Sequence, residues 1–304
     1  MHSGVAVLSD GRVLCAHPEG RDLLTIDPAG VTETIPTGLT EMHSIITSER
    51  NGHEVFGVAD PGHRFVENPA DPTAYTDHLA QGRAVILDTD GSVLLELGCP
   101  LLPVYEDGPW RPTSIAINDS RYTGNGDIWV ADGYGASLVH RFNASGQYLA
   151  TIDGTETGTA FACPHGIMLR ENQGSLELYV ADRTNRRIVV LDQDGTPLRT
   201  LGEGALDSPS SLVLVQDRMY VTELFGGVVR FDNDTFTRVL ELERTRSNEE
   251  DAWPNRRTTV GLDGPAVGPG HFNSPHGITA DDDWLYITEW FIGGRLSRLS
   301  LAQY

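Results

Sequence analysis

Pro164-His165-Gly166-Ile167 is the stretch that decides the fold, because the same four residues recur at Pro275-His276-Gly277-Ile278. A partial copy stands at Met42-His43-Ser44-Ile45. Each copy opens a segment in which apolar and polar residues alternate, as is typical of half-buried strands. After Pro164 and His165 the chain reads GIMLRENQGSLELYVADRTNRRIVVLDQDGTPLRTL, which indicates four strands with an Asp-Gly hairpin turn before the last. The motif therefore predicts the start of a four-stranded repeat.

Six such repeats can be aligned along the chain. The residues at the histidine position are Ser3, His43, Thr113, His165, Ser210 and His276. The shorter intervals match the roughly 40 to 50 residues of a propeller blade, and the longer ones contain insertions. We therefore expect an all-β protein, a six-bladed β-propeller forming a single domain over residues 1–304. The last repeat has room for only three strands, so the ring must close on an incomplete blade or borrow a strand.

Composition and charge restrict the partners. The 304 residues contain 22 Lys plus Arg against 43 Asp plus Glu, a net charge of -21, which disfavours nucleic acid and anionic lipid. No apolar segment approaches the roughly 18 residues that span a bilayer, and the N-terminus has no signal-peptide pattern. We expect a cytoplasmic monomer, secreted only if an export signal has been removed, whose partner is a small-molecule or short peptide-like substrate. Three irregularly spaced cysteines form no disulfide framework.

The insertions predict which face of the ring binds a ligand. In an antiparallel blade the first strand starts at the same end at which the second strand finishes. The insertions fall at this end, in blade junctions or between second and third strands, at 65–82, 98–111, 154–162 and 243–273. Because long loops carry most binding functions, this rim is the expected binding face.

His43, His165 and His276 lie in alternate blades, two, four and six. Equivalent positions on three innermost strands, roughly 120° apart in a sixfold propeller, aim three imidazoles at the axis. Catalytic zinc commonly takes three protein ligands and leaves a position for water or substrate. The pattern favours a three-histidine site for zinc or another divalent transition metal. The alternative is that each histidine only bonds neighbouring backbone.

Tyr134 and Arg183 follow the Val-Ala-Asp ends of the second strands in blades three and four. A guanidinium or a metal beside a tyrosine favours the phenolate and lowers its pKa, so the two residues are a candidate acid-base pair. The alternatives are that Tyr134 is a wall residue and that Arg183 pairs with Asp132 or Asp182. His63 is a further candidate for the rim.

The sequence resembles a known enzyme family. Pro-Thr-x-Ile-Ala at 112–116, Val-Ala-Asp-Gly-Tyr at 130–134, VADRTNRRI at 180–188 and the two Pro-His pairs are similar to the catalytic core of peptidyl-α-hydroxyglycine α-amidating lyase, a six-bladed propeller of NHL repeats. The resemblance covers roughly residues 40–300. It implies zinc bound by His43, His165 and His276, a catalytic tyrosine at Tyr134 and an active-site arginine at Arg183.

The chain departs from the family pattern at several positions. A second active-site arginine of the family matches Arg21 only after a shift. Ser274 replaces a methionine, Gly277 replaces an aspartate that serves a structural calcium, and Gly135 replaces a disulfide cysteine. These departures put a structural calcium, a disulfide and part of the substrate clamp in doubt. Arg256, in the insertion expected over the mouth, is a candidate replacement for the missing arginine, although a solvated charge run is the simpler interpretation.

The resemblance implies a lyase. Zinc would act as Lewis acid on the hydroxyl of an N-acyl-α-hydroxyglycine, Tyr134 would remove its proton, and the carbon-nitrogen bond would break to give an amide and glyoxylate. Arg183 would hold the substrate carboxylate or stabilise the phenolate. The altered clamp suggests a smaller or different carbinolamide substrate. Two alternatives stay open, a metal-dependent hydrolase or hydratase on the same site and a non-enzymatic NHL-repeat scaffold that binds proteins.

Overall fold

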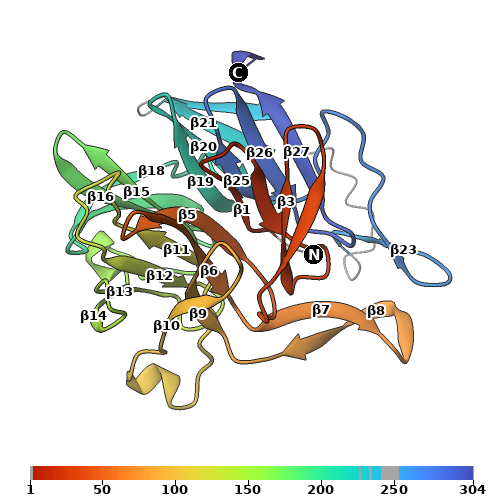
Figure 1. Ribbon diagram of the computed structural model, residues 1–304, viewed down its shortest axis with the longest axis horizontal. Coiled ribbons are helices and arrows are strands. Elements are labelled where there is room, and N and C mark those ends of the chain that lie inside the picture. Colours follow the sequence, from red (N-terminus) through yellow and green to blue (C-terminus); the bar gives the residue numbers. More distant parts are fainter. Residues whose placement is uncertain (1–2, 226, 233–234, 241–252, 304) are drawn as a thin grey trace.

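Six small antiparallel β-sheets form a ring in a computed structural model of the protein (Figure 1). The structure describes residues 3–225, 227–232, 235–240 and 253–303. No α-helix occurs in these ranges, and none of their helical turns is long and apolar enough to cross a membrane. The predicted all-β six-bladed propeller is confirmed.

The strands follow the predicted repeats. Blades one to three consist of β1 (Val5–Val7), β2 (Val13–Ala16), β3 (Asp22–Ile26) and β4 (Thr32–Pro36), then β5 (Ser44–Arg50), β6 (His53–Asp60), β9 (Arg83–Leu87) and β10 (Val93–Leu97), then β11 (Ser114–Ile117), β12 (Ile128–Asp132), β13 (Leu138–Phe142) and β14 (Tyr148–Ile152). Blades four to six consist of β15 (Pro164–Asn172), β16 (Ser175–Asp182), β17 (Arg187–Asp192) and β18 (Pro197–Leu201), then β19 (Pro209–Val215), β20 (Arg218–Glu223), β21 (Gly227–Asp232) and β22 (Thr235–Leu240), then β25 (Pro275–Ala280), β26 (Trp284–Glu289) and β27 (Arg295–Ser300).

The ring closes without a borrowed strand. Each innermost strand contacts the next, and β25 of the three-stranded last blade contacts β1 of the first. Figure 1 shows the red first blade beside the blue last one. The Thr288 hydroxyl donates a hydrogen bond of 2.6 Å to the Ser3 carbonyl across this junction. The prediction of an incomplete last blade is therefore confirmed within the part of the chain that the structure describes.

Hydrophobic packing lies between the blades. Second strands such as β12 are buried along their whole length because both faces meet a neighbouring sheet. One core cluster joins Trp129 of blade three to Ile167 and Leu178 of blade four. The apolar residues of each blade thus fix the angle to its neighbours, and through it the position of every blade opening around the axis.

Two extra hairpins extend the ring. β7 (His63–Asn68) and β8 (Asp71–Leu79) stand between β6 and β9 and project from the ring as the orange arm in Figure 1. β23 (Arg256–Arg257) and β24 (Leu262–Asp263) belong to the predicted insertion 243–273, of which residues 243–252 lie outside the described residues. β24 contacts β8, and the Asn255 amide donates a hydrogen bond to the Tyr75 hydroxyl. The two insertions therefore pack on each other.

Candidate metal centre

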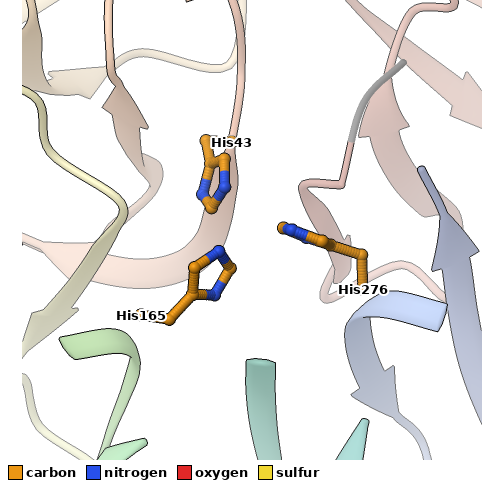
Figure 2. A group of neighbouring side chains, drawn as sticks. All are labelled: His43, His165 and His276. Carbon is orange, nitrogen blue, oxygen red and sulfur yellow. The ribbon is translucent and has the colours of Figure 1, made fainter. Parts of the chain in front are cut away.

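The three histidines converge on the ring axis, as Figure 2 shows. His43 stands directly before β5, while His165 and His276 lie in β15 and β25. Their ring centroids are 4.6 to 4.9 Å apart, and one ligand nitrogen from each lies within 4.8 Å of the others. All six blade openings line a narrow cavity of about 50 Å³ on this axis. The structure confirms the radial arrangement of the three histidines that the repeat predicts.

The Pro-His-Gly sequence has a local structural reason. The ladder between β15 and β16 is irregular between Pro164 and Ile167, and the ladder between β25 and β26 between Pro275 and Gly277. Such bulges redirect a side chain. The glycine that follows His165 and the one that follows His276 are needed, because a Cβ at Gly166 would lie 2.4 Å from the Ser210 carbonyl oxygen, and one at Gly277 only 1.7 Å from that of Ser3.

Backbone carbonyls fix the orientation of two imidazoles. Nδ1 of His43 lies 2.7 Å from the Thr113 carbonyl oxygen, and Nδ1 of His165 lies 2.8 Å from that of Ser210. Because a carbonyl only accepts, each Nδ1 carries the hydrogen and each Nε2 keeps its lone pair. Metal-binding histidines are commonly held in this way. The alternative of simple backbone bonding accounts for Nδ1 but not for the convergence of Nε2.

The residues present fit a divalent transition metal. Burial lowers the pKa of His43 to about 3, and burial, with the charge of Arg183, also holds the pKa values of His165 and His276 well below the usual range. Neutral imidazole is the form that binds a metal. Among the residues that the structure describes, these histidines are the one group of three or more His, Cys, Asp or Glu side chains that could hold an ion. Three nitrogen donors with an open side suit zinc, with other transition metals as alternatives.

Tyr134 covers the open side of the histidine group. Its hydroxyl lies 3.2 Å from His43 Nε2 and 3.0 Å from His165 Nε2, while 36% of the residue is exposed at the mouth. Burial of the hydroxyl raises the pKa of Tyr134 to about 12, although the Arg183 charge acts in the opposite direction. The expectation that the guanidinium lowers the pKa of Tyr134 is correct in sign, but desolvation of the hydroxyl outweighs the effect of the Arg183 charge.

Arg183 joins the same group. Its guanidinium contacts the Tyr134 hydroxyl at 3.4 Å, the Ser210 hydroxyl at 2.9 Å and His276 Nε2 at 3.3 Å. The Asp182 carboxylate instead accepts a hydrogen bond of 2.8 Å from Arg187, and Asp132 accepts one of 2.6 Å from a tyrosine. The alternative of an Arg183 ion pair with either aspartate is therefore wrong. Arg183 Nε is buried without a hydrogen-bond partner.

The other candidate residues are not brought into contact with the histidines in the described ranges. Arg21 is 64% exposed and lies 3.7 Å from Glu19, and Arg256 is exposed and donates to the Gly264 carbonyl. His63 Nε2 lies 2.9 Å from Asp77 on the β7–β8 hairpin. Ser274 is fully buried and donates 2.8 Å to the Trp290 carbonyl. Their substrate-binding roles stay predictions.

Two residues at the mouth were missed from the sequence. Glu41 is 6% exposed, and burial raises the pKa of its carboxyl to about 8, with Asp60 adding to the rise. Arg64 has a buried Nε without a hydrogen-bond partner, and its charge acts on Glu41. Glu41 stands two residues before His43, the position that Ser274 holds before His276, so the repeat could have pointed to it.

The cysteines agree with the sequence-based prediction. Cys15, Cys99 and Cys163 are free thiols. Burial raises the pKa of Cys15 to about 12. Cys15 is therefore a protonated core side chain at neutral pH.

The fold and the site together define the class of protein: a six-bladed β-propeller with three converging histidines, a tyrosine and an arginine at its mouth. No protein-family model matches the chain. Over 183 residues it is 30% identical to peptidyl-alpha-hydroxyglycine alpha-amidating lyase 2 of Drosophila melanogaster, in an alignment that covers 59% of this chain and 39% of that protein. Over 196 residues it is 26% identical to a probable peptidyl-alpha-hydroxyglycine alpha-amidating lyase of Caenorhabditis elegans, covering 61% and 54% respectively.

The alignments thus span about half or less of the length of these curated relatives. Among solved structures, a streptogramin B lyase superposes with a TM-score of 0.56 over 98% of this chain and 93% of its own, at 14% identity. At that identity the likeness concerns the fold alone. The two curated relatives carry lyase names.

Proposed function

We propose that the protein is a zinc-dependent lyase that cleaves the carbon-nitrogen bond of an N-acyl-α-hydroxyglycine-like carbinolamide to an amide and glyoxylate. The observation that carries the proposal is the position of the Tyr134 hydroxyl, within 3.2 Å of two imidazole Nε2 atoms and 3.4 Å of Arg183. A proton acceptor, a cationic donor and a group of metal ligands therefore meet at one point. Lyase names among the curated relatives support the same reaction class.

Each residue has a separate role in this proposal. His43, His165 and His276 would hold the metal, which supplies Lewis acidity toward the substrate hydroxyl. As the phenolate, Tyr134 takes the proton of that hydroxyl as the carbonyl of glyoxylate forms and the carbon-nitrogen bond breaks, and it returns the proton to the departing amide nitrogen, so that atoms and charges balance. A cation held by the histidines favours the phenolate and works against the burial that raises the pKa of Tyr134. Arg183 would place the substrate carboxylate through its guanidinium.

The test combines metal analysis with an assay of glyoxylate release. Tyr134→Phe should keep stoichiometric metal and the fold, yet lose on the order of 10²–10⁴-fold in turnover. Tyr148→Phe is the matched control, since Tyr148 is exposed on the outer strand β14. Stoichiometric metal without turnover of any α-hydroxyglycine would leave the site but refute the reaction. A hydrolysis product without glyoxylate would indicate a hydrolase. A protein that binds no metal would indicate a non-enzymatic scaffold.

A further inference from the structure

The mouth has a second side, made of aromatic residues. In blades four to six, the residue after the second strand donates its N–H to the carbonyl two residues before the blade opening. Arg183 does so to Cys163 at 3.2 Å, and Trp290 does so to Ser274 at 3.0 Å. Trp290 therefore holds in blade six the position that Arg183 holds in blade four. Because Arg183 reaches the histidines from this position, Trp290 belongs to the same rim.

Blade five adds a second aromatic residue to this rim. Leu224 donates to the Ser208 carbonyl at 3.1 Å, in the bond that Arg183 and Trp290 make in their blades. Phe225 is the following residue and so stands two residues after the end of its second strand, as Tyr134 does in blade three. Blades three and four thus place polar groups at the mouth, and blades five and six place aromatic rings.

The rings form one continuous surface, which we call the aromatic wall and which consists of Phe65, Tyr75, Phe225, Trp253 and Trp290. Ring centroids are 4.9 Å apart for Phe225 and Trp253, 5.6 Å for Trp253 and Trp290, 6.0 Å for Trp290 and Phe65, and 5.8 Å for Phe65 and Tyr75. The wall runs from blade five, across blade six, to the β7–β8 hairpin of blade two.

The members of the aromatic wall keep exposed surface. None of the five is buried, and Phe65 is 37% exposed, whereas the core residue Phe272 of the same region is 1% exposed. Packing of one insertion on another accounts for the contacts among the rings of the aromatic wall. It leaves the exposed apolar surface of these rings in water. Aromatic faces and edges at such spacing accept a further ring in an edge-to-face or offset arrangement, which adds to the energy of area burial.

We propose that the aromatic wall is a subsite for an aromatic acyl group of the substrate. The inference rests on the proposed lyase and names its substrate class, an N-arylacyl-α-hydroxyglycine. With the substrate carboxylate on Arg183 and its hydroxyl at Tyr134, the carboxylate and hydroxyl ends occupy the polar side formed by blades three and four. The acyl group on the nitrogen then extends to the other side of the mouth, where Trp290 stands.

Calorimetric titration with unreactive N-acylglycines tests this subsite without turnover. The metal-loaded wild type should bind N-phenylacetylglycine about tenfold more tightly than N-acetylglycine. Phe65→Ala should abolish most of that ratio and leave the affinity for N-acetylglycine unchanged. Leu79→Ala is the matched control, since Leu79 is 60% exposed on the same hairpin and is not part of the wall. It should keep the full ratio.

Equal affinity of the wild type for the two ligands, or binding of neither, would overturn the subsite. An equal weakening of both ligands by Phe65→Ala would also overturn it, since that result indicates a structural role. The binding result and the test of the lyase reaction are independent. A tenfold preference for N-phenylacetylglycine that depends on Phe65, without release of glyoxylate, supports the subsite and refutes the lyase reaction. Release of glyoxylate without that preference supports the lyase reaction and refutes the subsite.

Discussion

Gly277→Ala is the substitution whose effect the structure specifies most closely. A Cβ on Gly277 would lie 1.7 Å from the Ser3 carbonyl oxygen and 2.5 Å from Thr288 Oγ1. A relaxed carbon-oxygen contact needs about 3.3 Å, so the last and first blades must separate by about 1.6 Å. That shift also disturbs the buried 2.6 Å hydrogen bond from Thr288 to Ser3. Overpacking costs about 1–3 kcal/mol and the lost hydrogen bond about 1–3 kcal/mol, which together predict a loss of about 2–6 kcal/mol.

Urea unfolding of three alanine variants measures this loss. Gly98→Ala is the control, since a Cβ there meets nothing within 4 Å, and its free energy of unfolding should stay within about 0.5 kcal/mol of wild type. Gly166→Ala, with its Cβ 2.4 Å from the Ser210 carbonyl oxygen, should fall between the two. If Gly277→Ala unfolds at the same urea concentration as Gly98→Ala, the ring does not close by the contact described.

Further expected outcomes concern buried charges and the metal. Arg187→Met should lower the free energy of unfolding by about 3–5 kcal/mol, because it leaves the fully buried Asp182 without its ion pair. Arg12→Met, which removes an exposed ion pair, should cost less than about 1 kcal/mol. Equal losses would contradict the assignment of a buried ion pair between Arg187 and Asp182. Burial lowers the pKa of His140 to about 4, so the folded state binds fewer protons than the unfolded state between pH 6.5 and 4 and loses stability as the pH falls through this window. The difference in free energy of unfolding between wild type and His140→Gln should therefore shrink from pH 7 to pH 4. A difference that stays constant would refute this. Chelation should lower the thermal unfolding temperature of the metal-loaded protein and added zinc should restore it, while His165→Gln should make the temperature insensitive to both.

The sequence predicted the ring and the histidine group because both follow from the repeat. A position that recurs at each blade opening has the same depth in every blade, so histidines in blades two, four and six must meet near the axis. The side-chain directions of Arg183 and Arg187 could not be predicted in this way. Both arginines follow Asp182 within five residues, and only the folded β16–β17 corner shows that Arg187 bonds the carboxylate while Arg183 turns to Tyr134.

The aromatic wall was beyond sequence reasoning for a different reason. Phe65 and Trp290 belong to segments more than 200 residues apart, joined by insertions that follow no repeat period. Their contact depends on how the β7–β8 hairpin leans toward blade six, and no spacing rule determines that angle. Glu41 and Arg64 escaped notice in the same way, since burial, and not a motif, makes their polar groups unusual.

Blade openings without histidine have a function of their own. The Thr113 carbonyl orients His43, while the Thr113 hydroxyl accepts a hydrogen bond from the Gly133 N–H at 3.2 Å, directly before Tyr134. The Ser210 carbonyl orients His165, while its hydroxyl accepts a bond of 2.9 Å from Arg183. Thr113 and Ser210 thus each orient one imidazole through the backbone carbonyl, while their hydroxyls accept hydrogen bonds from the Gly133 backbone and the Arg183 guanidinium. A histidine at position 113 or 210 would keep the backbone carbonyl and lose the hydroxyl. The alternation of histidine with a small hydroxyl residue therefore allows three imidazoles, Tyr134 and Arg183 to meet near the axis of the ring.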